Sequence, residues 1–236
     1  MSAWVRSLFI GFIAGLLFLS MNCGLTFATP KDHSKHAPFI LGNDQQMILI
    51  DAGHGGVDGG TSYGRKLEKD ITLAISRKLY LILRSNGMDA ALNRFGDYAP
   101  SDENHWFRSS SRHQRDLTQR KGLADTLPTS VVVSIHVNWA PVSSIHGPLV
   151  LYKKEGRSFM LANAIQHQLN RLYKVDAYSK RGKPYFLLNQ ISATTVIVEA
   201  GFISSPIDRA KLFSRSGQQD IAEAIANGIA AYLMEV

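Results

Sequence analysis

Residues 47–68 most constrain the fold, because they join an apolar run to a turn unusually rich in glycine. Ile48, Leu49 and Ile50 are typical of a strand that is buried on both faces of a parallel sheet, and we expect it to end near Asp51. Glycines then occupy positions 53, 55, 56, 59 and 60. Glycine allows positive φ angles and close approach of the backbone to a ligand. In open α/β sheets such turns line the ligand crevice, so His54 is predicted to face a site.

Two simpler interpretations of this turn are a phosphate cradle and a purely structural turn. Neither nucleotide-binding pattern fits, because the third glycine position of the dinucleotide motif holds Asp58 and the lysine position of the P-loop motif holds Thr61. A structural turn with a solvated His54 stays open on this segment alone. The remainder of the chain has to decide between a structural turn and a functional site.

Composition limits the class of protein. The chain has 236 residues, 45% hydrophobic and 19% charged, which fits one α/β domain with a substantial core. Lysine and arginine outnumber aspartate and glutamate by 26 to 19. This balance favours a polyanionic environment such as nucleic acid, an anionic membrane or a cell wall. The basic residues are scattered and no RNA-binding motif or DNA-reading helix is recognisable, so we expect no nucleic-acid partner.

Residues 1–28 have the features of an export signal. Arg6 precedes an apolar stretch over residues 8–19, and residues 26–28 offer a cleavage site with a small residue at its end. An uncleaved run extending to residue 28 is long enough to span a bilayer, so a signal anchor is the alternative. Cys23 is the only cysteine and makes no intramolecular disulfide.

After a linker at residues 29–46, residues 47–236 alternate between strand and helix patterns and form one predicted α/β domain. Helices are predicted at 69–86, 112–125, 155–173 and 217–234, strands at 88–93, 130–137, 147–152 and 194–198, and a short strand or turn at 185–188. The polar loop at 95–111 is long for a structureless connection, so we expect it to face a substrate. In the helix that follows, four cations are expected mostly outward: Arg112, Arg115, Arg120 and Lys121.

Four side chains suited to metal or acid-base chemistry lie where these elements begin or end: His54, Glu68, His136 and Glu199. Glu68 alone is explained as a first-turn acid favoured by the helix dipole, and a lone histidine at a strand end is often a packing residue. Glu199 ends an apolar strand, where acids are rare unless paired or bound to a ligand. If the four converge, two histidines and a carboxylate suffice for catalytic zinc, and Glu199 is free to transfer protons.

Four motifs resemble the zinc-dependent N-acetylmuramoyl-L-alanine amidases of the amidase_3 type. They are DAGHGGVDGG at 51–60, LEKD at 67–70, SIHVN at 134–138 and VEAGFISSP at 198–206. The resemblance runs over residues 47–235. The segment RSSSRHQRDLTQR at 108–120 is most like the germination-specific cell-wall amidases of spore-forming bacteria.

The resemblance implies a single α/β domain whose mostly parallel mixed sheet is flanked by helices on both faces. It implies a peptidoglycan hydrolase that cleaves the amide between the lactyl group of N-acetylmuramic acid and L-alanine by zinc-activated water, with a role in spore cortex maturation. His54, Glu68 and His136 would bind Zn²⁺, and Glu199 would be catalytic. Arg94 and Asn138 would support the metal ligands or contact the substrate, although each is also explained as an ordinary polar loop residue.

Two other functions share part of this evidence: a zinc peptidase of different specificity and a non-catalytic cell-wall-binding module. A binding module needs no acid beside the metal, so Glu199 argues against it. A peptidase would share the metal chemistry, and only the family resemblance separates it from an amidase. Whether an activating protein partner is needed stays open.

We predict that the N-terminal segment exports the protein to the cell wall or the outer face of the membrane, with membrane contact only through that segment. Cell fractionation with N-terminal sequencing should find the protein outside the cytosol. Full-length protein in the cytosol, with an intact N-terminus and no membrane association, would contradict this prediction.

Overall fold

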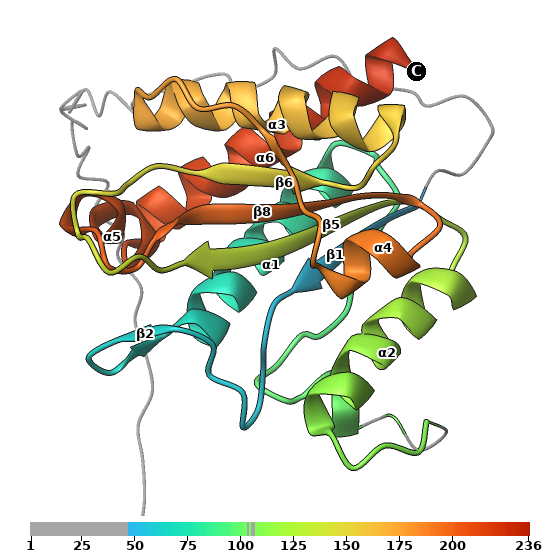
Figure 1. The fold of residues 1–236 in the computed structure, drawn as a ribbon. Helices are drawn as coiled ribbons and strands as arrows, with labels where there is room; N and C mark the ends of the chain where they lie inside the picture. The colour runs from blue at the N-terminus through green and yellow to red at the C-terminus, as the bar shows by residue number, and fades with distance from the viewer. Residues whose placement is uncertain (1–46, 103, 105–106) are drawn as a thin grey trace, which may run out of the picture. The chain divides into compact units, whose positions relative to one another are not determined.

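The computed structural model describes residues 47–102, 104 and 107–236 (Figure 1). The predicted signal segment and linker, residues 1–28 and 29–46, lie outside the described residues. Among the described residues, no helix combines the length and apolar character needed to cross a membrane.

A six-stranded mixed sheet forms the centre of the fold, in the order β4-β1-β5-β8-β6-β7. The strands are β1 (Met47–Ala52), β4 (Ala90–Leu92), β5 (Thr129–Asn138), β6 (Leu149–Tyr152), β7 (Lys180–Arg181) and β8 (Thr194–Phe202). Strands β4, β1, β5 and β8 run parallel to one another, whereas β6 is antiparallel to β8. The predicted mostly parallel mixed sheet is therefore confirmed. A separate hairpin pairs β2 (Ser62–Tyr63) with β3 (Lys66–Leu67).

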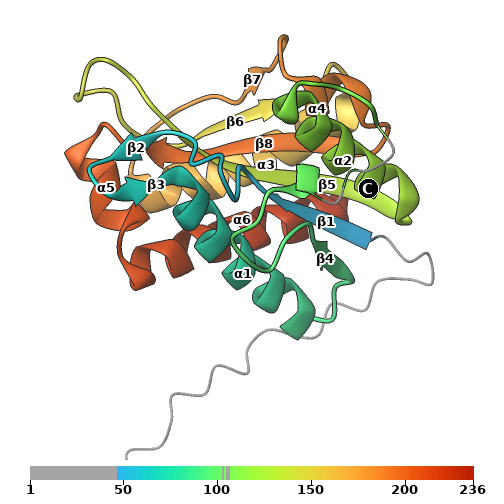
Figure 2. The ribbon, with the colours of Figure 1, turned by 90° about the horizontal axis from the view of Figure 1, so that it is seen from below.

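Helices cover both faces of the sheet, as the two views in Figures 1 and 2 show. The helices α1 (Glu68–Ser85), α3 (Gly156–Tyr173) and α6 (Arg215–Glu235) contribute to one large core cluster, and α2 (Arg112–Thr126) and α4 (Phe186–Gln190) contribute to a second, smaller one. Ile48 and Ile50 belong to the large cluster, and Leu49 between them belongs to the small one. Successive side chains of a strand point to opposite faces, which explains why β1 is apolar without interruption from Met47 to Ile50.

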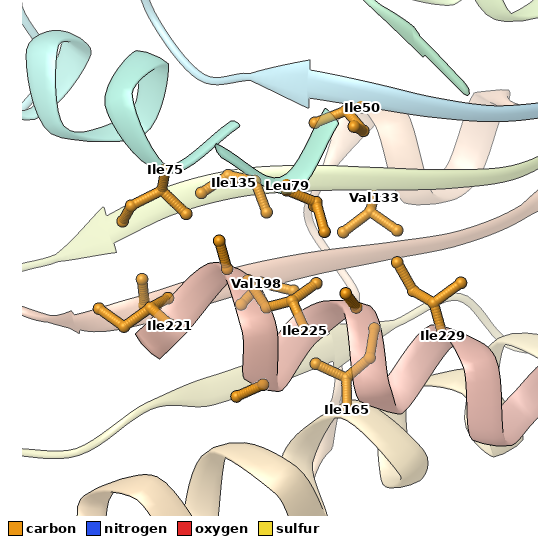
Figure 3. Close-up of a cluster of buried hydrophobic side chains, with 14 of the residues drawn as sticks. Ile50, Ile75, Leu79, Val133, Ile135, Ile165, Val198, Ile221, Ile225 and Ile229 are labelled. Atoms are coloured by element: carbon orange, nitrogen blue, oxygen red, sulfur yellow. The ribbon is translucent and has the colours of Figure 1, made fainter. Parts of the chain in front are cut away.

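The large cluster is built from branched aliphatic side chains (Figure 3). Ile221, Ile225 and Ile229 recur every four residues along α6, and they lie on the face of the helix that is buried against the sheet and α3. Val133 and Ile135 of β5 alternate with residues that face the other side. The periods of 3.6 and 2 that predicted these elements are thus both directed toward one core.

Two helices depart from the predictions. Residues 185–188, predicted as a short strand or turn, belong to the helix α4 and the residue before it. An apolar run this short fits either period, so the sequence pattern could not separate helix from strand. The helix α5 (Pro206–Leu212) was not predicted, although Ser205 and Pro206 are a recognisable start signal: the Ser205 hydroxyl accepts a hydrogen bond from the Asp208 amide.

Gly228 lies where α6 packs closely against α3. A Cβ added at this glycine would lie 2.5 Å from the Ile165 Cα, and backbone atoms cannot move aside as a side-chain end can. We predict that Gly228→Ala costs about 1–3 kcal/mol and lowers the melting temperature by several degrees. Gly156→Ala is the matched control, because a Cβ there would meet nothing within 4 Å. Equal melting temperatures for the two variants would contradict the packing argument.

Candidate metal centre and active site

His54, Glu68 and His136 come together at the carboxyl end of the parallel strands. One ligand atom of each lies within 4.8 Å of the others. His54 follows β1, Glu68 is the first residue of α1, and His136 lies near the end of β5. Glu68 Oε1 is 3.2 Å from His54 Nε2 and 3.1 Å from His136 Nδ1. Three separate elements of the fold therefore direct potential metal-ligand atoms toward one point.

Backbone amides hold the carboxylate of Glu68 in place. Its Oε2 accepts a hydrogen bond from the Thr61 amide and its Oε1 accepts one from the Val137 amide, both at 2.9 Å. Burial alone would raise the pKa of Glu68, but hydrogen bonds and charge from His136 and His54 outweigh burial and lower that pKa. Glu68 is therefore ionised and able to act as a metal ligand. An acid that only interacts with the helix dipole would not need these contacts with the two histidines.

A second carboxylate orients His54. The Nδ1 atom of His54 lies 3.0 Å from Asp58 Oδ2, which leaves Nε2 directed toward Glu68. Burial would lower the pKa of His54, but Glu68 and Asp58 together raise it. The backbone of His54 has φ 59°, a left-handed conformation that is uncommon for any residue other than glycine. Such local strain often marks functional sites.

These three residues fit a divalent transition metal. Two imidazole nitrogens and one ionised carboxylate are a common catalytic donor set for zinc, and a carboxylate behind a ligating histidine is its usual support. Both histidine side chains are 24% exposed, so a substrate has access to the donors. The group is the one cluster of metal-ligating residues found in the described part of the chain.

Glu199 lies on β8 next to His136 of β5, with which it is in register. It is 8% exposed. Burial raises the pKa of Glu199, and the charge of Glu68 adds to this increase while His136 opposes it. The structure thus places a carboxyl group of raised pKa beside the three donors, as expected for a residue that exchanges protons near neutral pH.

A cavity of about 390 Å³ connects these groups. Its lining includes His54, His136 and Glu199, together with His113, Leu117 and Ile197 and the segment from Pro184 to Leu187. The described residues of the polar loop 95–111 are not among those that line this cavity, so the cavity gives no support to the predicted substrate-facing role. The loop instead supports the glycine turn, because Asp97 accepts hydrogen bonds from the Gly56 amide (2.8 Å) and the Lys69 ammonium (2.7 Å).

Arg94 and Asn138, for which two roles were considered, occupy different environments. Arg94 is fully buried and donates to the carbonyl oxygens of Ala52, Gly53 and Lys69, so it supports the turn and is not positioned to contact a substrate. Asn138 is partly exposed at the end of β5, and its Oδ1 accepts a hydrogen bond from the Trp139 amide. Asn138 is not among the residues that line the cavity.

Arg120, predicted to point outward, is 5% exposed. It forms an ion pair with Asp51 and a second with Asp116 (3.0 Å), and it donates to the His54 carbonyl at 2.8 Å. The prediction was wrong because cations on a polar helix are usually solvated, whereas this one has a buried acid to neutralise it. Asp51, at the end of an otherwise apolar strand, was the available signal for such a partner.

The sequence profile of the Amidase_3 family, N-acetylmuramoyl-L-alanine amidase, matches residues 48–231. The chain belongs to this family. It is similar to the germination-specific N-acetylmuramoyl-L-alanine amidase of Bacillus subtilis, with 28% identity over 96% of this chain and 94% of that protein.

Solved structures agree with this family. The CwlD amidase from Clostridioides difficile, determined in complex with the GerS lipoprotein, has a TM-score of 0.75 and 31% identity, and the match covers 81% of this chain and 100% of that one. The catalytic domain of CwlV from Bacillus (Paenibacillus) polymyxa has a TM-score of 0.67 and 28% identity, over 80% of this chain and 98% of that one. Both are amidases by name, and both share the α/β fold described above.

Gly60 provides a test of the donor geometry. A Cβ added there would lie 2.5 Å from Glu68 Oε2 and 2.7 Å from His54 Cδ2. We predict that Gly60→Ala displaces these side chains and weakens zinc binding by about 10-fold or more, measured by titration with a competing chelator. Gly64→Ala is the control, because Gly64 has a similar positive φ but a Cβ there would meet nothing within 4 Å. Equal zinc affinity in the two variants would show that the donors do not bind zinc in this arrangement.

Proposed function

We propose that the protein is a zinc-dependent N-acetylmuramoyl-L-alanine amidase that hydrolyses the amide between the lactyl group of N-acetylmuramic acid and L-alanine in peptidoglycan. His54, Glu68 and His136 hold the zinc ion, and Glu199 transfers the proton. The observation that carries the proposal is that Glu199 lines the same cavity as two of the three donors. Membership of the Amidase_3 family supports the choice of substrate.

The chain's own residues account for binding and proton transfer. When bound, Zn²⁺ supplies Lewis-acid polarisation of the substrate carbonyl and lowers the pKa of a water molecule. Asp58 fixes the ring of His54, and the amides of Thr61 and Val137 fix Glu68, so the donors need little rearrangement. Glu199 accepts a proton from the attacking water and passes it to the leaving nitrogen, so that L-alanine departs as an amine.

The alternatives fit less well. A cell-wall-binding module would not need a buried acid of raised pKa beside the metal donors. A zinc peptidase would use the same donors, but the family, the Bacillus subtilis relative and CwlV are described as N-acetylmuramoyl-L-alanine amidases. Similarity to a germination-specific amidase supports a role in the spore cortex, which is part of this proposal.

We also propose how the protein is exported and that it has a protein partner. Residues 1–28 act as a signal peptide or signal anchor, residues 29–46 link it to the catalytic domain at 47–236, and the domain works in the cell wall or at the outer face of the membrane. The structure of the CwlD amidase was determined in complex with a lipoprotein, and we propose that this chain also has a protein partner.

Glu199→Gln separates chemistry from metal binding. The amide keeps the size of the side chain but cannot accept a proton, so we expect zinc content and melting temperature to persist while turnover falls by about 10²–10⁴. The assay is digestion of purified muropeptides followed by mass analysis of the fragments. Glu223→Gln, a change at an exposed acid of α6, is the control and should behave as the wild-type protein does.

His136→Ala completes the test, because it should lose zinc and activity together. Loss of zinc from Glu199→Gln would make Glu199 a ligand and not a proton carrier. Fragments cut within the stem peptide, with the muramoyl amide intact, would identify a peptidase and refute the proposed function.

A further inference from the structure

The start of α4 contributes a part of the cavity lining that the chemistry described so far does not use. Pro184, Tyr185, Phe186 and Leu187 line the cavity together with Glu199. Three of these four side chains are wholly apolar. Tyr185 is different, because it places a polar hydroxyl at the end of an apolar ring.

The chain holds Tyr185 in a defined position. The side-chain amide of Asn189 donates to the Tyr185 carbonyl at 2.7 Å and to the Lys183 carbonyl at 2.9 Å. Gly182 packs against this segment so closely that an added Cβ would lie 3.1 Å from the Tyr185 ring and 2.3 Å from a methyl group of Leu188. Leu188 is itself fully buried. The segment is therefore fixed to the core on one side and faces the cavity on the other.

The Tyr185 hydroxyl is suited to donate a hydrogen bond to a ligand. The side chain is 39% exposed, and within the described part of the chain its hydroxyl has no hydrogen-bond partner. Burial, together with the negative charge of Glu199, raises the pKa of Tyr185. The hydroxyl therefore keeps its proton at neutral pH, and it lies within electrostatic range of the acid that the mechanism uses.

The proposed substrate has matching chemistry. The scissile amide is flanked on both sides by a carbon that carries a methyl group, one from the lactyl group and one from L-alanine. Apolar side chains such as Leu117 and Ile197 form a cavity surface that suits such methyl groups. The carbonyl groups attached to the methyl-bearing carbons need hydrogen-bond donors.

We propose that Tyr185 is a substrate-positioning residue: its ring packs against the methyl groups beside the scissile amide, and its hydroxyl donates a hydrogen bond to a substrate carbonyl. This inference rests on the proposed amidase function and adds a recognition element to it. Tyr185 holds the amide against Glu199 but takes no part in proton transfer.

Tyr185→Phe removes only the hydroxyl. We expect KM for a synthetic muramoyl-L-alanyl peptide to rise by about 3- to 10-fold with kcat within about two-fold, since a hydrogen bond made equally before and during reaction affects binding alone. Tyr185→Ala also removes the ring, and should lower the preference for this substrate over its muramoyl-glycyl analogue, which lacks one methyl group. Tyr178→Phe is the control, because Tyr178 is 78% exposed and does not line the cavity.

A wild-type KM in Tyr185→Phe, or a fall in kcat that accompanies a lowered melting temperature, would overturn the positioning role while leaving the amidase function intact. Failure of the unmodified protein to cleave the muramoyl-L-alanyl peptide would overturn both proposals. A raised KM in Tyr185→Phe, with the melting temperature of the Tyr178→Phe control, would support the inference.

Discussion

The ion pair between Arg120 and Asp51 is the interaction on which the candidate site depends. Both side chains are almost fully buried, and an unpaired charge in such a place costs several kcal/mol. The pairing is complete: Asp51 also accepts hydrogen bonds from Asn93 and Ser134, each at 2.6 Å, and Arg120 is also paired with Asp116. Burial would raise the pKa of Asp51, but Arg120 and Ser134 outweigh it and lower that pKa, so the pair stays charged. The network can therefore act as a fixed support.

What the network supports is the backbone of the glycine turn. Arg120 donates to the carbonyls of Ala52 and His54, and Arg94 donates to those of Ala52 and Gly53. Buried carbonyls must find partners, and a turn that leaves a strand has lost those of the sheet. The two guanidinium groups, one from α2 and one from the loop after β4, replace the lost partners. Arg94 also donates to Lys69 in the first turn of α1, and so ties the turn that carries His54 to the helix that carries Glu68.

The sequence predicted the parts of this site that follow a strong pattern. Apolar runs placed the strands, the motifs identified His54, Glu68, His136 and Glu199, and the structure brings these four residues together. The supporting network could not be predicted in the same way. The helix at 112–126 is largely polar and has no apolar period that would orient it, so nothing local shows that Arg120 faces inward while Lys121 is partly exposed. The position of Tyr185 in the cavity lining depends on the packing of a five-residue helix, which is too short for its period to be read.

The register of the central strands determines which side chains face the site. The face of the sheet that α2 and α4 cover carries Leu49 and Asp51 of β1, Val132 and His136 of β5, and Ile197 and Glu199 of β8. The two residues of each strand are two or four positions apart, so their side chains point to the same face. A slip of one residue between β5 and β8 would turn Glu199 toward the large core and put Val198 or Ala200 in its place. Val196 and Val198 are buried in that core, so such a slip would also turn apolar side chains toward the cavity and move a carboxyl group into the apolar core. The alternating apolar residues of β8 therefore specify the direction in which its one acid points, and the packing of the core holds the proposed proton acceptor beside the three proposed metal ligands.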